Sequence, residues 1–218
     1  QAIHCFDLAA MTKIYGTEAL FIFDPDDQSN RPVPGEQDNP LIFWPIYPQS
    51  LRDLFTRAFT DGIKDPENGR VQENEWRKTM LSLRDSIIYC PHCGEQNFYD
   101  VDALKKQGKL NPCWNCQKEI VTPPRIRIGS KIIMLNHDTK LFPHHVDDRK
   151  KYDFSEPVAE VVRNPKNPSL WGLKNLSTAK WVVNTADNNM KDVEPGRSVT
   201  LAVGTKINFG TEQGEIRV

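Results

Sequence analysis

Apolar residues recur at helical spacing in two stretches of the first half of the chain. The first stretch places them at i, i+3, i+4, i+7, i+8 and i+12, at Leu51, Leu54, Phe55, Ala58, Phe59 and Ile63. The second places them at i, i+4, i+7 and i+11, at Trp76, Met80, Leu83 and Ile87. Each pattern predicts a helix with one apolar face, and the Asp-Pro-Glu-Asn-Gly run between them predicts a turn. We therefore expect a helical pair that needs a further apolar partner, for which segment 1–24 is a candidate.

The last part of the chain shows a different pattern, in which short β-rich runs alternate with Asn, Asp, Pro and Gly. The runs are 125–136, 159–164, 171–177, 181–185, 198–203, 205–210 and 214–218. Strands at this spacing predict a β-sandwich. Segment 24–40 is dense in Asp, Asn, Pro and Gly and predicts a long loop.

Four of the five cysteines lie between the helical and the β-rich regions, in two C-x-x-C pairs. Cys90 and Cys93 form the first pair, and Cys113 and Cys116 follow after nineteen residues. Each pair predicts a tight turn that points two thiolates at one ion, and four thiolates complete a tetrahedral Zn2+ shell. The spacing therefore predicts a zinc ribbon over residues 90–124.

Other chemistries of the four cysteines fit the sequence less well. Two disulfides would suit a secreted protein, but the chain shows no secretory leader, and a redox C-x-x-C pair would need a thioredoxin-like context. An iron–sulfur cluster stays open as an alternative. A catalytic zinc keeps one ligand position open, whereas four thiolates close the shell, so we expect a structural Zn2+. Gly94 supplies the turn after the first pair, and Gln117 at the equivalent place in the second is a departure.

Composition and charge narrow the function classes. Hydrophobic residues make up 38% of the chain and charged residues 26%, which is typical of a packed globular protein. The formal net charge of −1 lacks the basic excess of a general nucleic-acid binder. No run of 18 apolar residues predicts a transmembrane helix. Two C-x-x-C pairs with a lone Cys5 suit a reducing compartment, so we expect a cytoplasmic location. The chain begins at Gln1 rather than Met, which suggests a piece of a longer protein.

Several histidine, tryptophan and basic residues could be functional, but their sequence context favours structural or surface roles. His137, His144 and His145 suggest a second metal site, but adjacent histidines on a strand point to opposite faces, so surface or partly buried histidines are favoured. Trp171 and Trp181 are expected to anchor the sandwich core. The basic residues of segment 125–131 are expected to lie on a solvent-exposed face of a strand. They are Arg125, Arg127 and Lys131.

Residues 46–81 resemble the end of the C-terminal lobe of eukaryotic-type Ser/Thr protein kinases. The resemblance rests on an amphipathic helix, an Asp65-Pro66 turn, Arg70 and a Glu75-Trp76 pair, with Gln72 where such kinases often have a Thr or Ser cap. The Gly-rich loop, the His-Arg-Asp loop and the Asp-Phe-Gly motif of that family are missing from the sequence. We therefore expect no activity and no catalytic or cofactor-binding residues in this chain, whereas the full-length parent would be a Ser/Thr protein kinase.

Residues 171–181 and 195–218 are similar to the second half of a forkhead-associated (FHA) domain. The family's closing pattern falls on Leu201, Gly204, Thr205, Ile207 and Gly210. Asn175 and Ser177 lie near the turn that borders the phosphopeptide in that family. The family's Gly-Arg and Ser-Arg-x-His motifs are replaced here by other residues, in segments 141–146 and 154–162. The resemblance implies an FHA-like sandwich that does not bind phosphothreonine in the family manner, because a dianion needs charged donors.

The order of these parts resembles the C-terminal region of the bacterial kinases of the tellurium-resistance-associated triad, whose other members are a PP2C-type phosphatase and a von Willebrand A protein. The implied fold is α+β and multidomain, with a kinase C-lobe remnant over 1–89, a four-cysteine zinc ribbon over 90–124 and an FHA-like β-sandwich over 125–218. The implied function is a non-catalytic regulatory and protein-docking region of a signalling complex, with the von Willebrand A protein and the phosphatase as partners. No membrane partner is expected.

Two alternatives stay open. A nucleic-acid-binding zinc ribbon is supported by Lys105, Lys106 and Lys109, and it predicts an affinity that falls steeply with salt. A phosphothreonine-peptide-binding FHA module is the other alternative. It is distinguished by whether phosphothreonine peptides bind at all.

Overall fold

The computed structural model describes residues 8–12, 15–16 and 18–218, and it divides the chain into two compact units. The helical unit comprises Gln1–Arg84 and Asp100–Trp114, and the sandwich unit comprises Asp85–Tyr99 and Asn115–Val218. Helices together with antiparallel sheets confirm the α+β class. No helix in the described part of the chain is both long enough and apolar enough to cross a bilayer. Cys5 lies outside the described residues.

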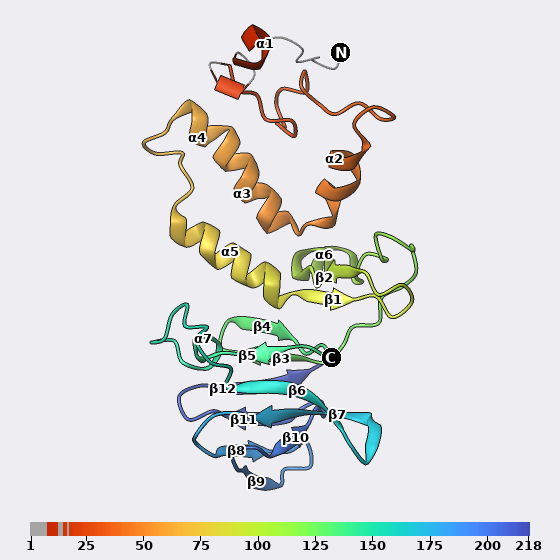
Figure 1. Cartoon of the computed structure of the whole chain (residues 1–218), viewed down its shortest axis with the longest axis vertical. Helices are drawn as coiled ribbons and strands as arrows, with labels where there is room; N and C mark the ends of the chain where they lie inside the picture. Colours follow the sequence, from red (N-terminus) through yellow and green to blue (C-terminus); the bar gives the residue numbers. More distant parts are fainter. Residues whose placement is uncertain (1–7, 13–14, 17) are drawn as a thin grey trace. The chain divides into compact units, whose positions relative to one another are not determined.

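The helical unit consists of short helices, which Figure 1 draws in red, orange, yellow and green. They are α1 (Leu8–Thr12), α2 (Asp38–Phe43), the 3-10 turn η2 (Trp44–Ile46), α3 (Gln49–Phe59), α4 (Asp61–Lys64), α5 (Glu73–Asp85) and α6 (Val101–Gln107). Helix α3 buries Leu51 and Leu54, as its apolar stripe predicts. Phe59 and Ile63, at the far end of that stripe, stay 45% and 44% exposed.

Aromatic side chains supply much of the packing in the helical unit. Phe23 stacks on Trp44 with ring centroids 4.6 Å apart, and Phe55 meets Trp76 edge to face at 5.0 Å. Such pairs contribute about 0.5–1.5 kcal/mol each beyond the area they bury. The predicted partnership of segment 1–24 with the helices is confirmed by Phe21, whose ring stacks on Phe59 of α3 with centroids 5.6 Å apart.

The turn that joins the two main helices requires a glycine. A Cβ atom on Gly69 would lie 2.3 Å from the carbonyl oxygen of Asp61, and the Gly69 N–H donates to the Asp65 carbonyl at 2.8 Å. Helix α5 then begins with Glu75 accepting the Gln72 N–H at 3.0 Å, which is half of a capping box. Gln72 therefore occupies the position before the first residue of α5, although its side chain lacks the hydroxyl group of a Ser or Thr cap. Helix α5 ends at Asp85, so the prediction that Ile87 lies on it was wrong.

Ile87 belongs to a strand because Ile87, Ile88 and Tyr89 form a β-favouring run. This strand, β1 (Ile87–Tyr89), pairs antiparallel with β2 (Gln96–Phe98) in the sandwich unit. The first cysteine pair lies in the turn between them. Asn136 donates to the Ile87 carbonyl oxygen at 2.7 Å, so β1 is hydrogen-bonded to the chain segment that follows β4 (Lys131–Met134).

Two antiparallel sheets form the rest of the sandwich unit (Figure 1). The four-stranded sheet has the order β10-β7-β6-β5, and the six-stranded sheet has the order β4-β3-β12-β11-β8-β9. The bounds not yet given are β3 (Arg125–Ile128), β5 (Lys140–Leu141), β6 (Ala159–Asn164), β7 (Asn167–Asn175), β8 (Trp181–Asn184), β9 (Met190–Val193), β10 (Ser198–Thr200), β11 (Lys206–Asn208) and β12 (Gln213–Arg217). Every predicted β-rich run contains a strand, whereas β5 and β9 were missed.

One core lies between the two sheets. Leu173 on β7, Val199 on β10, and Ile126 and Ile207 from the six-stranded sheet are all buried in the same apolar cluster. Trp181 belongs to this cluster and is 1% exposed, which confirms the predicted core role. Trp171 packs against the cluster from its edge, with the Arg163 guanidinium 4.5 Å from its ring centroid. This shared core is the β-sandwich that the spacing of the strands predicts.

Candidate metal centre

The first cysteine pair forms a tight knuckle whose backbone is closed by two hydrogen bonds. The Gly94 N–H donates to the Cys90 carbonyl, and the Cys90 N–H donates to the Glu95 carbonyl, both at 2.9 Å. Gly94 has a φ of 81°, a left-handed conformation that glycine adopts without steric cost. The glycine predicted from the sequence to make this turn therefore does so.

The second pair uses the same backbone conformation without a glycine. Gln117, one residue after Cys116 as Gly94 is one residue after Cys93, has a φ of 58°. A non-glycine residue with a left-handed backbone conformation costs about 1–2 kcal/mol of conformational energy. The fold carries this strain at Gln117, where the first pair has a glycine. Both cysteine pairs are therefore followed by a residue with a positive φ.

The four thiols lie in one group. The Sγ atoms of Cys90, Cys93, Cys113 and Cys116 are all within 4.8 Å of one another, and Cys90 Sγ lies 3.6 Å from Cys116 Sγ. Four sulfurs at a Zn–S distance of about 2.3 Å around a tetrahedral ion would lie about 3.8 Å apart, so this donor set fits Zn2+. Cys90 and Cys113 are buried, whereas Cys93 is exposed. The residues could hold one metal ion in an all-sulfur shell.

The surroundings of Cys90 favour the thiolate that a metal requires. Burial by itself raises the pKa of Cys90, but the backbone N–H groups of His92 and Cys93 and contacts with the Cys116 and Cys93 thiols lower it, and the net direction is below the usual pKa. Only the deprotonated sulfur binds a metal well. A bound Zn2+ would supply a cross-link among the four cysteines, and these four thiols leave no ligand position for water.

A second group of metal-type side chains lies in the sandwich unit, where Asp85, His144 and His145 place their ligand atoms within 4.8 Å of one another. The two histidines lie in the short helix α7 (Pro143–Val146), so the expectation of a strand with opposite-facing histidines was wrong. Pro143 at the first helical position explains the helix, because its fixed φ suits a helix start. The rings of His144 and His145 lie 4.0 Å apart between centroids, and both residues are buried.

Hydrogen bonds assign His145 a role other than metal binding. The Phe142 N–H donates to Nδ1 of His145 at 2.8 Å, so Nδ1 carries no proton. The ring proton is then on Nε2, which lies 3.3 Å from Asp85 Oδ1. The lone pair of Nδ1 accepts a hydrogen bond and Nε2 faces Asp85, so this ring offers no free lone pair to an ion. His144 and His145 are buried rather than at the surface or partly buried, as the sequence had suggested, and His145 serves as a hydrogen-bonded link from α7 to the end of α5.

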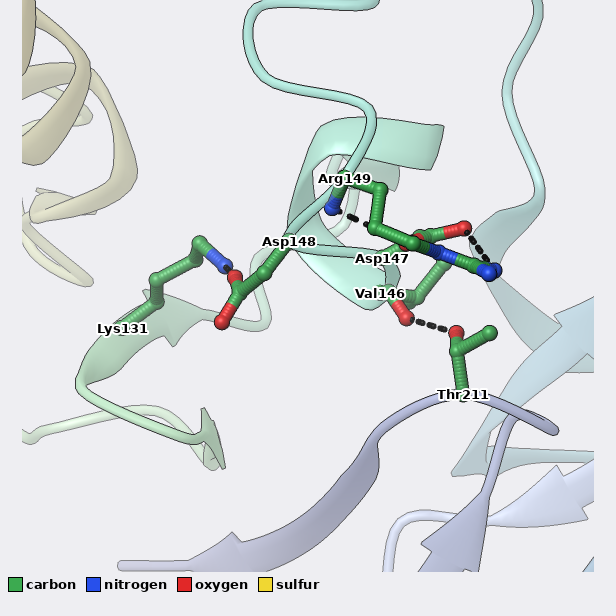
Figure 2. Close-up of polar contacts among 6 residues, drawn as sticks. All are labelled: Lys131, Val146, Asp147, Asp148, Arg149 and Thr211. Atoms are coloured by element: carbon green, nitrogen blue, oxygen red, sulfur yellow. Dashed lines mark hydrogen bonds and ion pairs between the residues drawn. The ribbon is translucent and has the colours of Figure 1, made fainter.

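A network of charged and polar groups fixes the chain after α7, as Figure 2 shows. Arg149 forms two side-chain hydrogen bonds with Asp147, both at 2.9 Å, while Lys131 pairs with Asp148. The hydrogen bonds from the Arg149 side chain and backbone lower the pKa of Asp147 to about 2. Thr211 Oγ1 donates to the Val146 carbonyl at 2.5 Å, which ties α7 to the β11–β12 turn.

The hydroxyl groups of Ser155, in the loop before β6, and of Ser177, in the turn after β7, already donate hydrogen bonds within the chain. Ser155 Oγ donates to Asp153 Oδ1 at 2.6 Å, and these bonds lower the pKa of Asp153, so that a carboxylate stands there. Ser177 Oγ lies 2.7 Å from Asn175 Oδ1, and the fully buried Asn175 donates to the carbonyls of Ala179 and Val193 at 2.8 and 3.0 Å. The predicted pair Asn175 and Ser177 is thus brought together, as a brace for the β7–β8 turn.

Asp85 and Asp153 are among the residues of these clusters that were not singled out from the sequence. Asp85 is separated from His145 by 60 residues, and no local pattern links them. Asp153 lies two residues before Ser155, which is the spacing of an Asx turn, so the local sequence does contain a signal for this contact.

No family model matches the chain, and no curated protein matches it. A solved structure, the crystal structure of the MEK1 FHA domain in complex with the HOP1 pThr318 peptide, is similar with a TM-score of 0.30 and 11% sequence identity. The match covers 45% of this chain and 98% of that one.

Proposed function

We propose that the chain is a non-catalytic protein-docking region, in which a structural Zn2+ holds the cysteine segment and an FHA-like sandwich presents the docking surface. The observation that carries the proposal is the group of four cysteine thiols that fits a closed metal shell. A closed shell stabilises a small segment of chain and performs no chemistry on a substrate.

The wider setting of this proposal rests on the sequence resemblance. The region would belong to a bacterial cytoplasmic Ser/Thr protein kinase of the tellurium-resistance-associated triad. Its partners would be the von Willebrand A protein, and through it the PP2C-type phosphatase. The chain itself would transfer no phosphate, since the kinase motifs are missing from its sequence.

Docking through a phosphothreonine pocket is not the mode that we propose. The phosphate dianion needs several strong donors. In this sandwich the Ser155 hydroxyl donates to a carboxylate and the Ser177 hydroxyl to an amide oxygen. The segment where the family's arginine turn would lie is the buried helix α7. A surface of the sandwich, rather than its loops, is therefore the proposed contact.

The test is calorimetric titration of the zinc-loaded chain with the von Willebrand A protein of the same system. We expect a complex that survives in the presence of a competing phosphothreonine peptide. A single-stranded RNA and a phosphothreonine peptide serve as the other two titrants. No heat with the von Willebrand A protein, or binding of either other titrant at equal strength, would contradict the proposal.

A further inference from the structure

The outer face of the six-stranded sheet carries a row of charged side chains fixed by strand register. On β3 and β12, Ile126, Ile128 and Ile216 are buried in the core, so alternate residues point outward. Glu215 is paired in register with Arg127 on one side and with Lys206 on the other. Three neighbouring strands therefore place a carboxylate between two cations, and both cationic residues are exposed.

A second register pair brings like charges together. Arg125 lies directly opposite Arg217 on the same face. Like charges directly opposite on neighbouring strands are destabilising, by roughly the 0.2–1 kcal/mol that a favourable pair contributes. Arg217 pairs with Glu215, and the Arg125 guanidinium lies 5.0 Å from the ring centroid of Tyr99. These contacts hold both arginines on a face where an anionic partner would relieve their repulsion.

The charge balance of this face differs from that of the chain. The outward residues of β3, β11 and β12 include one carboxylate, Glu215, and four cations, which are Arg125, Arg127, Lys206 and Arg217. Nearby Lys180 and Asp192 pair with each other and cancel. The face is therefore cationic by three charges, since four cations oppose one carboxylate, whereas the whole chain carries a net charge of −1. Hydrogen bonding to Arg217 lowers the pKa of Glu215, so this carboxylate stays ionised at neutral pH.

A polar atom on the same face lacks a donor among the described residues. Asn184 on β8 is paired in register with Lys206, and its Oδ1 atom is buried with no hydrogen bond. A buried acceptor without a donor costs about 1–3 kcal/mol. Because this atom has no accessible surface, a partner on the face cannot reach it, and the docking surface is made by the exposed cations alone.

We propose that the outer face of the six-stranded sheet, centred on Arg127, Lys206 and Arg217, docks an acidic segment of a partner protein. The inference rests on the proposed docking function and names its surface. Arginine pairs with carboxylates through two parallel hydrogen bonds, and lysine adds a point charge. A protein segment suits this face better than a nucleic acid, because Glu215 interrupts the row and would repel a continuous track of phosphates. A polypeptide can place a neutral or basic residue opposite Glu215.

The first experiment uses a fluorescein-labelled peptide of ten glutamates, titrated by fluorescence polarisation with the whole zinc-loaded chain. The test variant carries Arg127→Glu with Lys206→Glu. The control carries Lys150→Glu with Lys166→Glu, an equal charge change at exposed positions away from this face. We expect the test variant to bind about tenfold or more weakly, since close charge pairs across interfaces couple strongly, and the control to lose about threefold or less.

Each outcome of this titration either supports or overturns the proposed docking face. Equal losses in the two variants would show that only net charge matters and would overturn the proposal. A single-stranded RNA of 12 nucleotides that binds more tightly than the peptide, and loses binding in the test variant, would also overturn it in favour of nucleic acid. Thermal unfolding checks that both variants fold. If the test variant does not, Arg127→Gln with Lys206→Gln replaces it, and the same reduction is expected.

A second titration separates this proposal from the proposed function. The von Willebrand A protein of the same system is titrated with the unchanged chain and with the Arg127→Glu, Lys206→Glu variant. No binding by the unchanged chain contradicts the proposed function. Equal binding by both contradicts the docking face alone, and loss in the test variant with retention in the Lys150→Glu, Lys166→Glu control supports both.

Discussion

His145 Nε2 lies 3.3 Å from Asp85 Oδ1, and both side chains are at most 10% exposed. The bond connects the helix that follows β5 to the last residue of α5. Because the Phe142 N–H is bonded to the other ring nitrogen, His145 holds two backbone segments through one ring. The consequence is a stability contribution that depends on the acceptor at position 85.

Asp85→Ala is expected to lower the free energy of unfolding of the sandwich unit by about 1–3 kcal/mol, because it leaves a buried ring N–H without an acceptor. Asp85→Asn keeps an acceptor oxygen and should lose less. Urea unfolding followed by tryptophan fluorescence measures both. Equal destabilisation by the two changes, or loss of bound metal in Asp85→Ala, would show that His145 is not held in the way described.

Cys113→Ser is expected to remove the metal, since it opens the sulfur shell. Elemental analysis should find about one zinc per unchanged chain and far less in the variant. We expect the cysteine segment to unfold while the far-ultraviolet circular dichroism of the sandwich persists. Cys5→Ser is the matched control, because Cys5 belongs to neither C-x-x-C pair. Collapse of the sheet signal in Cys113→Ser would mean that the sandwich also depends on the metal.

Gln117→Gly should tighten zinc binding, because glycine adopts the positive φ of this position without strain. A gain of about 1 kcal/mol corresponds to roughly a fivefold stronger affinity in competition with a chromogenic chelator. Gly94→Ala is the reverse experiment and should weaken binding by a similar factor. A neutral effect at both positions would show that the positive φ after each cysteine pair does not influence metal binding.

Acid should weaken the loop after α7 through Asp147. Its pKa is lowered from 3.8 to about 2 in the folded protein, so its ionised form stabilises the fold above about pH 4, and this contribution disappears as the pH falls towards 2. Arg149→Gln removes the hydrogen bonds that lower the pKa. The difference in melting temperature between the unchanged chain and this variant should therefore be largest above pH 4 and shrink towards pH 2. A difference that is constant across this range would exclude the pair as its origin.

Local chemistry made much of the structure predictable from the sequence. The C-x-x-C spacing brings Cys90 and Cys93 together in one turn, and alternation on the β3 run separates Ile126 from Arg127. Both depend on residues close in the chain. Strand β9 was not predicted because Met190, Lys191 and Asp192 have low strand propensity. Its strand conformation comes from pairing with β8.

The remaining features depend on contacts between distant residues. Helix α7 replaces the expected strand at His144 because Pro143 starts a helix and the His145 ring caps it. Its link to Asp85 crosses 60 residues. The end of α5 was misplaced because Ile87 continues the helical spacing while its pairing with Phe98 makes it a strand. Periodicity alone carries no information about such partners.

The membership of residues 85–99 in the sandwich unit has a practical consequence for anyone expressing this domain. A recombinant protein started at residue 125 would lack Asp85 beneath His145, the Ile87 carbonyl that accepts from Asn136, and the Tyr99 ring beside Arg125. Such a truncation would leave the buried His145 ring N–H and the part-buried Asn136 amide without their acceptors, so we expect a less stable sandwich. Expression designs should begin upstream of Asp85 and keep the cysteine segment as an integral part of the gene product.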